Sequence, residues 1–199
     1  MGEPSLAPNS APSATRSRAL PTKIVFAGTF EGFFRSLRDR LTPELKAKLR
    51  AEGLDLDKKL APGYPFEVWV RVVDVVAEGL YSGLSQAEAH WKLGEDFLRG
   101  FAETVIGRAM FGVLRLLGPM KAFARMERNW RSGSNYVETK FTALNPTCAE
   151  VWMTGVDGRP WFNAGIILEG GRQIGVKNLR VEIVRCVADE ATYRVTWDA

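Results

Sequence analysis

The period of the hydrophobic pattern changes once along the chain, and this change limits the possible folds more than any other feature. In the first two-thirds, apolar residues recur every three or four positions, most regularly over 119–131. After a Ser-Gly-Ser-Asn break at 132–135 they alternate over 136–144 and 147–153. A period near 3.6 indicates helices, and a period of 2 indicates half-buried strands. We therefore expect an α+β fold in which the helical first two-thirds packs on a small, mainly antiparallel C-terminal sheet, with one interposed helix at 160–171.

Short local signals predict where several helices begin and end. Thr42 and Ser85 are typical N-caps, and Glu88 completes a capping box with Ser85. Gly53 is typical of the residue that follows a helix C-terminus. The Pro-Gly-Tyr-Pro run at 62–65 is typical of a turn. These signals divide the first two-thirds of the chain into separate helices with short connections.

Composition indicates a leader followed by one domain. Residues 1–20 are rich in Pro, Ser and Ala, which is typical of a flexible leader. We expect residues 21–199 to form a single domain. A chain that is 46% hydrophobic, with 11 Phe and 6 Trp, can form a core without metals or disulfides. Cys148 and Cys186 are too few for a disulfide framework, so we expect a cytoplasmic protein in which both are buried apolar side chains. No apolar run approaches the roughly 20 residues of a membrane span.

The sequence lacks the residues of common catalytic sites. Its single histidine, His90, excludes metal sites built on several imidazoles, and two cysteines do not complete a zinc tetrahedron. Phosphate-binding and nucleophile-elbow glycine motifs are absent. We therefore expect no metal, no cofactor and no enzymatic activity, with His90 on the surface or half-buried early in a helix. An enzyme would depend on carboxylates without visible pairing, namely Glu67, Glu78, Glu95, Asp96 and Glu103.

Aromatic residues lead to the first functional hypothesis. We expect an apolar pocket lined by Tyr64, Trp69, Phe97, Phe101, Trp130 and Phe162. Arg131, Asn135 and Tyr136 lie at the helix-to-strand junction and would form the polar mouth of this pocket. The protein would then be a non-catalytic, regulatory module that binds a small apolar or anionic molecule. Core packing also explains the aromatic residues, and pairing with buried carbonyls explains the junction, so both interpretations stay open.

A basic segment leads to the second hypothesis. Residues 115–131 contain five basic residues and one acidic residue, an excess equal to the net charge of the whole chain, +4. The basic face of the helix expected at 119–131 consists of Lys121, Arg125 and Arg128. This face is a candidate surface for a protein partner or a homodimer, with a solvated face as the alternative. The balance of charge elsewhere argues against nucleic acid as a partner.

Several short motifs occur in the order seen in a known family. They are Gly53-Leu-Asp-Leu, Tyr64-Pro with Trp69, Leu93-Gly94, Gly100-Phe101, Arg131-Ser-Gly-Ser-Asn-Tyr136 and Tyr193-Arg-Val-Thr-Trp197. As a set they are similar to an uncharacterised family of this length that is greatly expanded in myxobacteria, and the similarity spans roughly residues 23–198. That family has no assigned activity, so the resemblance implies membership and no mechanism.

The expected order of elements also resembles haem-nitric-oxide-binding sensors, 4-vinyl-reductase-type ligand-binding domains and TRAPP trafficking subunits. In the haem sensors a proximal His precedes a Tyr-x-Ser-x-Arg signature. Here Tyr136-Val-Glu-Thr-Lys140 has Glu138 and Lys140 in place of the Ser and Arg, and no His stands at the expected distance upstream. The vinyl-reductase type carries two Cys in its final hairpin, of which Cys186 matches the first and Thr192 lies near the second. The resemblance thus implies a cavity between helices and sheet, and a dimer, without haem bound through that signature.

Overall fold

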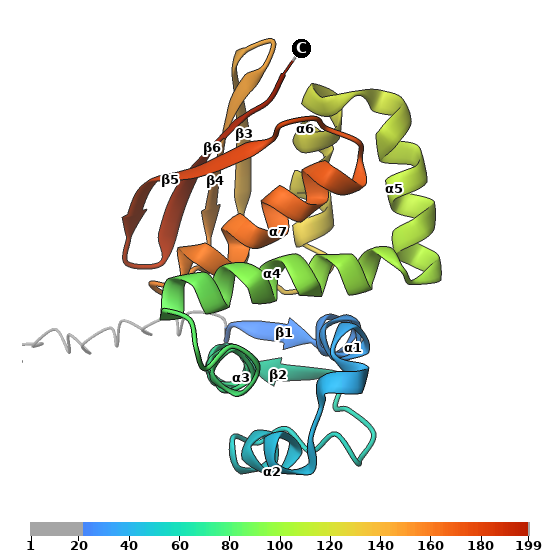
Figure 1. Ribbon diagram of the computed structural model, residues 1–199, viewed down its shortest axis with the longest axis vertical. Coiled ribbons are helices and arrows are strands. Elements are labelled where there is room, and N and C mark those ends of the chain that lie inside the picture. Colours follow the sequence, from blue (N-terminus) through green and yellow to red (C-terminus); the bar gives the residue numbers. More distant parts are fainter. Residues whose placement is uncertain (1–21, 199) are drawn as a thin grey trace, which may run out of the picture.

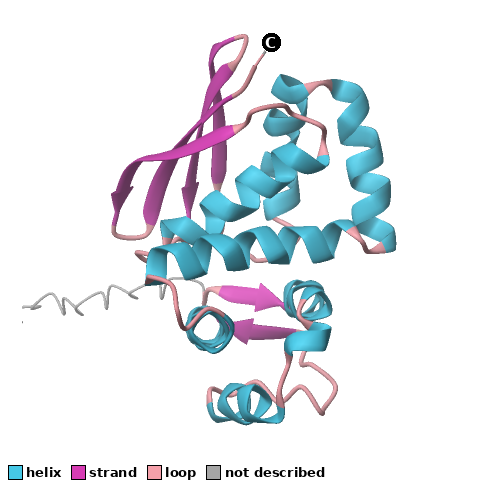
Figure 2. Ribbon diagram, in the orientation of Figure 1, coloured by secondary structure: helices cyan, strands magenta, loops and turns pink. Residues whose placement is uncertain are grey.

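The computed structural model describes residues 22–198, except for the side chains of 126–129. Its elements are β1 (Ile24–Phe26), α1 (Ala27–Ser36), a short 3-10 turn (Arg38–Arg40), α2 (Pro43–Ala51), β2 (Gly63–Pro65), α3 (Phe66–Leu80), α4 (Gln86–Ala102), α5 (Val105–Leu117), α6 (Pro119–Trp130), β3 (Thr139–Asn145), β4 (Cys148–Thr154), α7 (Pro160–Gln173), β5 (Arg180–Val187) and β6 (Glu190–Thr196). Most helices precede the C-terminal sheet in the chain, and α7 lies between its strands β4 and β5 in chain order (Figure 1, Figure 2). The predicted α+β architecture is confirmed, and the predicted leader lies outside the described residues.

The C-terminal sheet is antiparallel throughout, with strand order β3-β4-β6-β5. Buried and half-buried residues alternate along β4 and β6, so one face of the sheet is turned toward the core. On that face Met153 and Tyr193 pack with Phe123 of α6 and Ile167 of α7. The buried Tyr193 hydroxyl donates a hydrogen bond of 3.0 Å to the carbonyl oxygen of Pro160. The interposed helix is therefore held against the sheet by both apolar and polar contacts.

A second, two-stranded sheet lies among the helices of the first half of the chain (Figure 1). Its strands β1 and β2 are antiparallel, with Val25 opposite Tyr64. Gly63 passes so close to Ile24 that a Cβ atom at Gly63 would lie 2.6 Å from that side chain. The prediction of a turn at 62–65 is therefore wrong. The segment pairs with residues far away in the sequence, and such pairing overrides a local preference for turns.

The predicted helix caps are confirmed. Thr42 Oγ1 accepts a hydrogen bond of 3.2 Å from the backbone N–H of Leu45. Ser85 and Glu88 bond each other's backbone N–H groups reciprocally, as a capping box requires. Gly53 follows the end of α2 with φ of +91°, which suits glycine. These boundaries depend on neighbouring residues alone, which is why the sequence predicted them.

Helices α4 and α7 cross in direct backbone contact and join the two halves of the molecule (Figure 1). A Cβ atom at Gly94 of α4 would overlap the carbonyl oxygen of Phe162, and one at Gly165 of α7 would overlap the carbonyl oxygen of Trp91. Glycine permits this approach because it has no side chain. The crossing therefore leaves no room for a ligand between the two helices.

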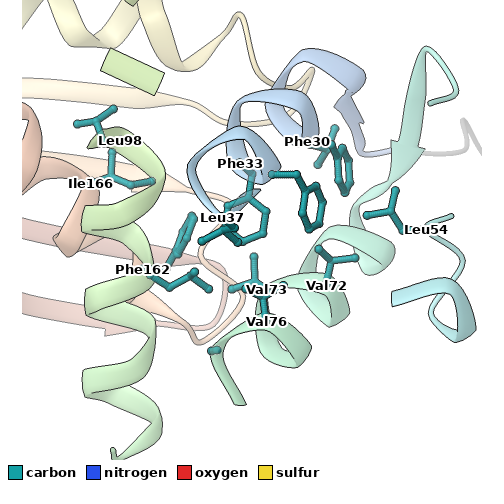
Figure 3. Close-up of a cluster of buried hydrophobic side chains, with 14 of the residues drawn as sticks. Phe30, Phe33, Leu37, Leu54, Val72, Val73, Val76, Leu98, Phe162 and Ile166 are labelled. Carbon is teal, nitrogen blue, oxygen red and sulfur yellow. The ribbon is translucent and has the colours of Figure 1, made fainter. Parts of the chain in front are cut away.

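The larger hydrophobic core fills the helical half. Figure 3 shows Phe30 and Phe33 of α1 in this core with Val72 and Val73 of α3 and Phe162 of α7. None of the helices in the described part of the chain is both long and apolar enough to cross a membrane.

The two cysteines lie on the sheet, outside both cores. Cys148 on β4 is half-buried, and Cys186 on β5 is exposed. The prediction that both are buried is therefore wrong. Strand β5 is an edge strand, and most of its side chains face solvent, so its hydrophobic residues are less buried than their type suggests.

Candidate ligand-binding site

Aromatic rings from four helices meet in the core of the helical half. We call them the aromatic cluster: Phe30 and Phe33 of α1, Trp69 of α3, Phe97 of α4 and Phe162 of α7. Between ring centroids, Phe33 lies 5.3 Å from Trp69 and 5.8 Å from Phe97. Trp69 lies 5.9 Å from Phe162. The rings are tilted or edge-on to one another, which is the attractive geometry for aromatic pairs.

The three other predicted pocket residues, Tyr64, Phe101 and Trp130, lie outside the aromatic cluster at different positions. The ring of Tyr64 is 4.9 Å from Phe30. Phe101 lies against α1, 3.7 Å from where a Cβ atom of Gly32 would be. Trp130 is half-buried and packs against both hydrophobic cores. The structure thus brings Tyr64 to a ring of the aromatic cluster and Phe101 to the larger core beside α1, and it places Trp130 against both hydrophobic cores.

Phe30 and Phe33 are the cluster residues that sequence reasoning missed as site candidates. Both are fully buried, whereas Trp69 and Phe97 are only half-buried. Their spacing of three residues in a helix was the available signal, because it places both rings on one face. The aromatic cluster therefore has a closed centre on α1 and an accessible margin on α3 and α4.

Two hollows open on the surface of the helical half. One, of about 290 Å³, lies between α3 and α4 and is lined in part by Asp74 and His90. The other, of about 480 Å³, lies where α1 ends beside α4 and is lined in part by Arg40, Asp96 and Arg99. The lining of the second hollow is mainly polar, that of the first is polar and apolar in about equal parts, and no ring of the aromatic cluster belongs to either one. Both hollows are distinct from the predicted apolar pocket.

The junction after α6 pairs with β1. The Asn135 side chain accepts a hydrogen bond of 2.7 Å from the Ile24 N–H and donates one of 3.0 Å to the Thr22 carbonyl. The Gly133 carbonyl accepts hydrogen bonds from the Phe26 N–H at 3.0 Å and from the Thr29 hydroxyl at 2.9 Å. These contacts satisfy backbone groups of the first strand and helix, so Asn135 has a structural role here.

The two other junction residues differ in their surroundings. Tyr136 packs its ring 4.7 Å from that of Phe66, with the Lys23 ammonium 5.5 Å from its centroid. Burial, followed by nearby carboxylates such as Asp189, raises the pKa of the Tyr136 phenol well above its usual value. Arg131 is exposed. Of the three predicted mouth residues, Arg131 and Asn135 are exposed, and the Asn135 amide is already hydrogen-bonded to the first strand.

His90 is buried, so the prediction of a surface or half-buried position is wrong. Its side chain is 1% exposed, and its Nε2 lies 3.1 Å from Asp74 Oδ1 on α3. Asp74 also accepts two hydrogen bonds from Arg159, at 2.8 and 2.6 Å. Burial alone would raise the pKa of Asp74, but the hydrogen bonds from His90 and Arg159 and the charge of Arg159 lower it to about 2. The imidazole is buried because this carboxylate offers it a partner inside the fold.

Two of the five acidic residues considered for catalysis, Glu95 and Asp96, are engaged in polar contacts. Asp96 accepts hydrogen bonds from Arg40 and from the hydroxyl of Tyr81. Glu95 lies 3.4 Å from Arg172 on α7. Within 22–198, no group of three or more His, Cys, Asp and Glu side chains is arranged to hold a metal ion. Glu95 and Asp96 therefore connect α4 to neighbouring elements.

The predicted basic face of α6 is described in part. Lys121 and Arg125 are exposed, and neither forms an ion pair within the described part of the chain. The side chain of Arg128 lies outside the described residues. Lys121 and Arg125 are thus accessible to a partner, and the partner-binding role of this face stays a prediction.

Comparison with solved structures identifies the fold as that of H-NOX domains. An oxygen-binding H-NOX domain related to soluble guanylate cyclases, in its oxygen complex, gives a TM-score of 0.64 at 14% identity, over 86% of this chain and 94% of that chain. A mutant H-NOX of T. tengcongensis gives a TM-score of 0.65 at 16% identity, over 86% and 97%. A haem protein studied for porphyrin distortion gives 0.67 at 14% identity, over 86% and 94%. At these identities the comparison shows a common fold.

No curated protein matches the chain at a significant level. The family model described as "Protein of unknown function (DUF2378)" matches residues 23–198, the span over which the motifs predicted an uncharacterised family. The chain therefore belongs to the DUF2378 family of proteins of unknown function.

Proposed function

We propose that this protein is a regulatory module that binds a small apolar molecule at the margin of the aromatic cluster and performs no chemistry on it. The main supporting observation is the convergence of rings from four helices, of which Trp69 and Phe97 stay half-buried. Tyr64 and Phe101 extend this margin with further half-buried rings. Such rings offer apolar contact area to a ligand. The fold is shared with domains that include an oxygen-binding one.

Haem, which the fold neighbours suggest, does not fit the residues of this chain. Haem iron is held by an axial His, Cys or Tyr, and Met serves as a second ligand beside a His. His90 is hydrogen-bonded to Asp74 beside the smaller hollow, outside the aromatic cluster. Cys148 and Cys186 lie on the sheet, and the Tyr64 hydroxyl already accepts a hydrogen bond from a backbone N–H. Because α4 and α7 are in backbone contact, a porphyrin has no space between them. The proposed ligand is therefore smaller than haem.

Entry to the proposed site requires side-chain rotation at its margin. Phe30 and Phe33 are fully enclosed, so a ligand would displace ring contacts of Trp69 and Phe97 first. Arg131 is the predicted mouth residue best suited to meet a polar group of the ligand, because Asn135 is bonded to β1. A ligand with an apolar body and at most one polar group suits these surroundings.

Native mass spectrometry of protein purified from its host tests this proposal. We expect a small-molecule adduct on the wild-type chain and its loss in Trp69→Leu, which removes a ring from the margin of the aromatic cluster. Trp152→Leu is the matched control, because Trp152 is a half-buried tryptophan on β4 that bonds Glu190, away from the aromatic cluster. Circular dichroism checks that both variants are folded.

Two results would contradict the proposal. One is a wild-type chain that carries no adduct from its host and shows no thermal shift with a panel of small apolar molecules. The other is an adduct that Trp69→Leu retains as fully as Trp152→Leu does, since the ligand would then lie elsewhere.

A further inference from the structure

The outer side of α5 carries the most exposed large apolar side chains in the described part of the chain. Leu116, Val105 and Ile106 are 86%, 75% and 73% exposed, and Val113 is 54% exposed. Figure 1 shows α5 along the outer edge of the molecule, with the other helices and the sheet to one side of it. Exposed apolar patches on proteins mark interaction sites. This surface is separate from the proposed ligand site.

Helical geometry makes these side chains one continuous stripe. The α5 stripe consists of Val105, Ile106, Ala109, Gly112, Val113 and Leu116, which share one side of a helix at about 100° per residue. It is about 17 Å long at a rise of about 1.5 Å per residue. Ala109 and Gly112 lie in its middle, and a Cβ atom at Gly112 would meet nothing within 4 Å. Small residues between large ones form a shallow groove that the ridge of another helix can enter.

Charge around the α5 stripe has a single sign. Residues 104–126 contain no Asp or Glu, and their four basic residues are Arg108, Arg115, Lys121 and Arg125. On the helix, Arg108 and Arg115 lie along the same edge of the stripe, two turns or about 10 Å apart. Arg108 has no ion-pair partner within the described residues, and Arg115 bonds the Gln173 carbonyl through its Nε. A partner that covers this surface must combine apolar side chains with negative charge.

This requirement argues against two nearby candidates. A second copy of the chain would bring two sets of Arg108 and Arg115 together without any acidic residue on either α5, and like charges in an interface are unfavourable. The chain's own residues 1–21 contain Arg16 and Arg18 against one acidic residue, Glu3, so they do not supply negative charge either. The groove at Ala109 and Gly112 fits a helix backbone and gives no advantage to a flat bilayer.

We propose that the α5 stripe binds an amphipathic helix of another protein. The apolar face of that helix lies over Ala109 and Gly112, with Leu116, Val105 and Ile106 around it. Its carboxylates face Arg108 and Arg115. Lys121 and Arg125 of α6 are further exposed cations on the helix that follows α5.

Fluorescence anisotropy with designed peptides tests this proposal on the full chain. The probe is a labelled helical peptide of about 15 residues, about 22 Å long, with a Leu and Ala face edged by Glu. We expect it to bind the wild-type chain, and a twin with Lys in place of Glu to bind at least about tenfold more weakly. Leu116→Ser and Arg108→Glu should each weaken the Glu peptide about tenfold. Val187→Ser is the control, because Val187 is 54% exposed on β5, away from α5.

Three results would overturn the proposal. Equal affinity of the wild type, Leu116→Ser and Arg108→Glu for the Glu peptide would show that the stripe is not its site. Sedimentation with phosphatidylglycerol vesicles that Leu116→Ser abolishes would assign the surface to a membrane. A concentration-dependent dimer that Leu116→Ser abolishes would assign it to a second copy. All substituted side chains are exposed, so the variants should keep the thermal midpoint of the wild type.

Discussion

The Asp74 carboxylate leads to a quantitative prediction for Asp74→Asn. It joins α3 to α4 through His90 and to the start of α7 through Arg159. Burial by itself would raise its pKa, yet these partners lower the pKa from 3.8 to about 2. A tenfold change in acidity corresponds to about 1.4 kcal/mol, so the ionised carboxylate stabilises the fold by about 2 kcal/mol. The side chain is 25% exposed, so solvent screens only part of this interaction. Asp74→Asn should lower the free energy of unfolding at pH 7 by about this amount.

The effect of Asp74→Asn should depend on pH in one direction. The pKa of Asp74 is lower in the folded than in the unfolded chain, so its contribution is complete above about pH 4. It is lost as the pH falls through about 2. Urea unfolding followed by circular dichroism, at about pH 7 and about pH 2.5, measures the difference between wild type and variant.

A surface carboxylate provides the control for this measurement. Asp57 is 56% exposed and pairs with Arg50 at 2.5 Å, so Asp57→Asn should cost less than about 0.5 kcal/mol. The reasoning fails if the two variants are equally stable at pH 7. It also fails if Asp74→Asn is as costly near pH 2.5 as at pH 7.

Three further substitutions test packing and capping. Gly94→Ala would place a Cβ atom on the Phe162 carbonyl and should lower the free energy of unfolding by about 2 kcal/mol or more, whereas Gly112→Ala, in open space within a helix, should raise it by about 0.8 kcal/mol. Thermal melts compare the two, and a neutral Gly94→Ala would argue against the backbone contact. Tyr193→Phe removes a buried hydrogen bond to the Pro160 carbonyl and should cost about 1 kcal/mol, measured by urea midpoint. Ser85→Ala removes the capping box and should cost about 1 kcal/mol, with faster hydrogen exchange in the first turn of α4.

Features of the fold that depend on neighbouring residues were predictable from the sequence. The caps at Thr42 and Ser85 involve residues three positions away, and the change from helix to strand follows from periodicity. The strand at 63–65 was not predictable, because its partner is β1, almost forty residues earlier. Local turn signals cannot report a pairing over that distance.

The same distinction applies to the candidate site. Trp69, Phe97 and Phe162 were predicted together because large aromatic residues on amphipathic helices tend to face a common core. The burial of His90 was missed, because it depends on Asp74 and Arg159 from two other elements. The role of Asn135 stayed open for a similar reason, since its partners lie over a hundred residues away. Polar side chains of this kind are explained only by the tertiary fold.

Helix α1 is the part of the molecule on which both ends of the α5–α6 segment rest. At the entry to α5, Phe101 lies against Gly32, and at the exit from α6, the Gly133 carbonyl bonds the Thr29 hydroxyl. These two contact points are three residues apart on α1, so the two ends return to nearly the same place. The same helix carries Phe33 into the centre of the aromatic cluster. Because α5 also bonds α7 through Arg115, a partner that displaced α5 would disturb contacts of both α1 and α7, the helices that carry Phe33 and Phe162 into the aromatic cluster.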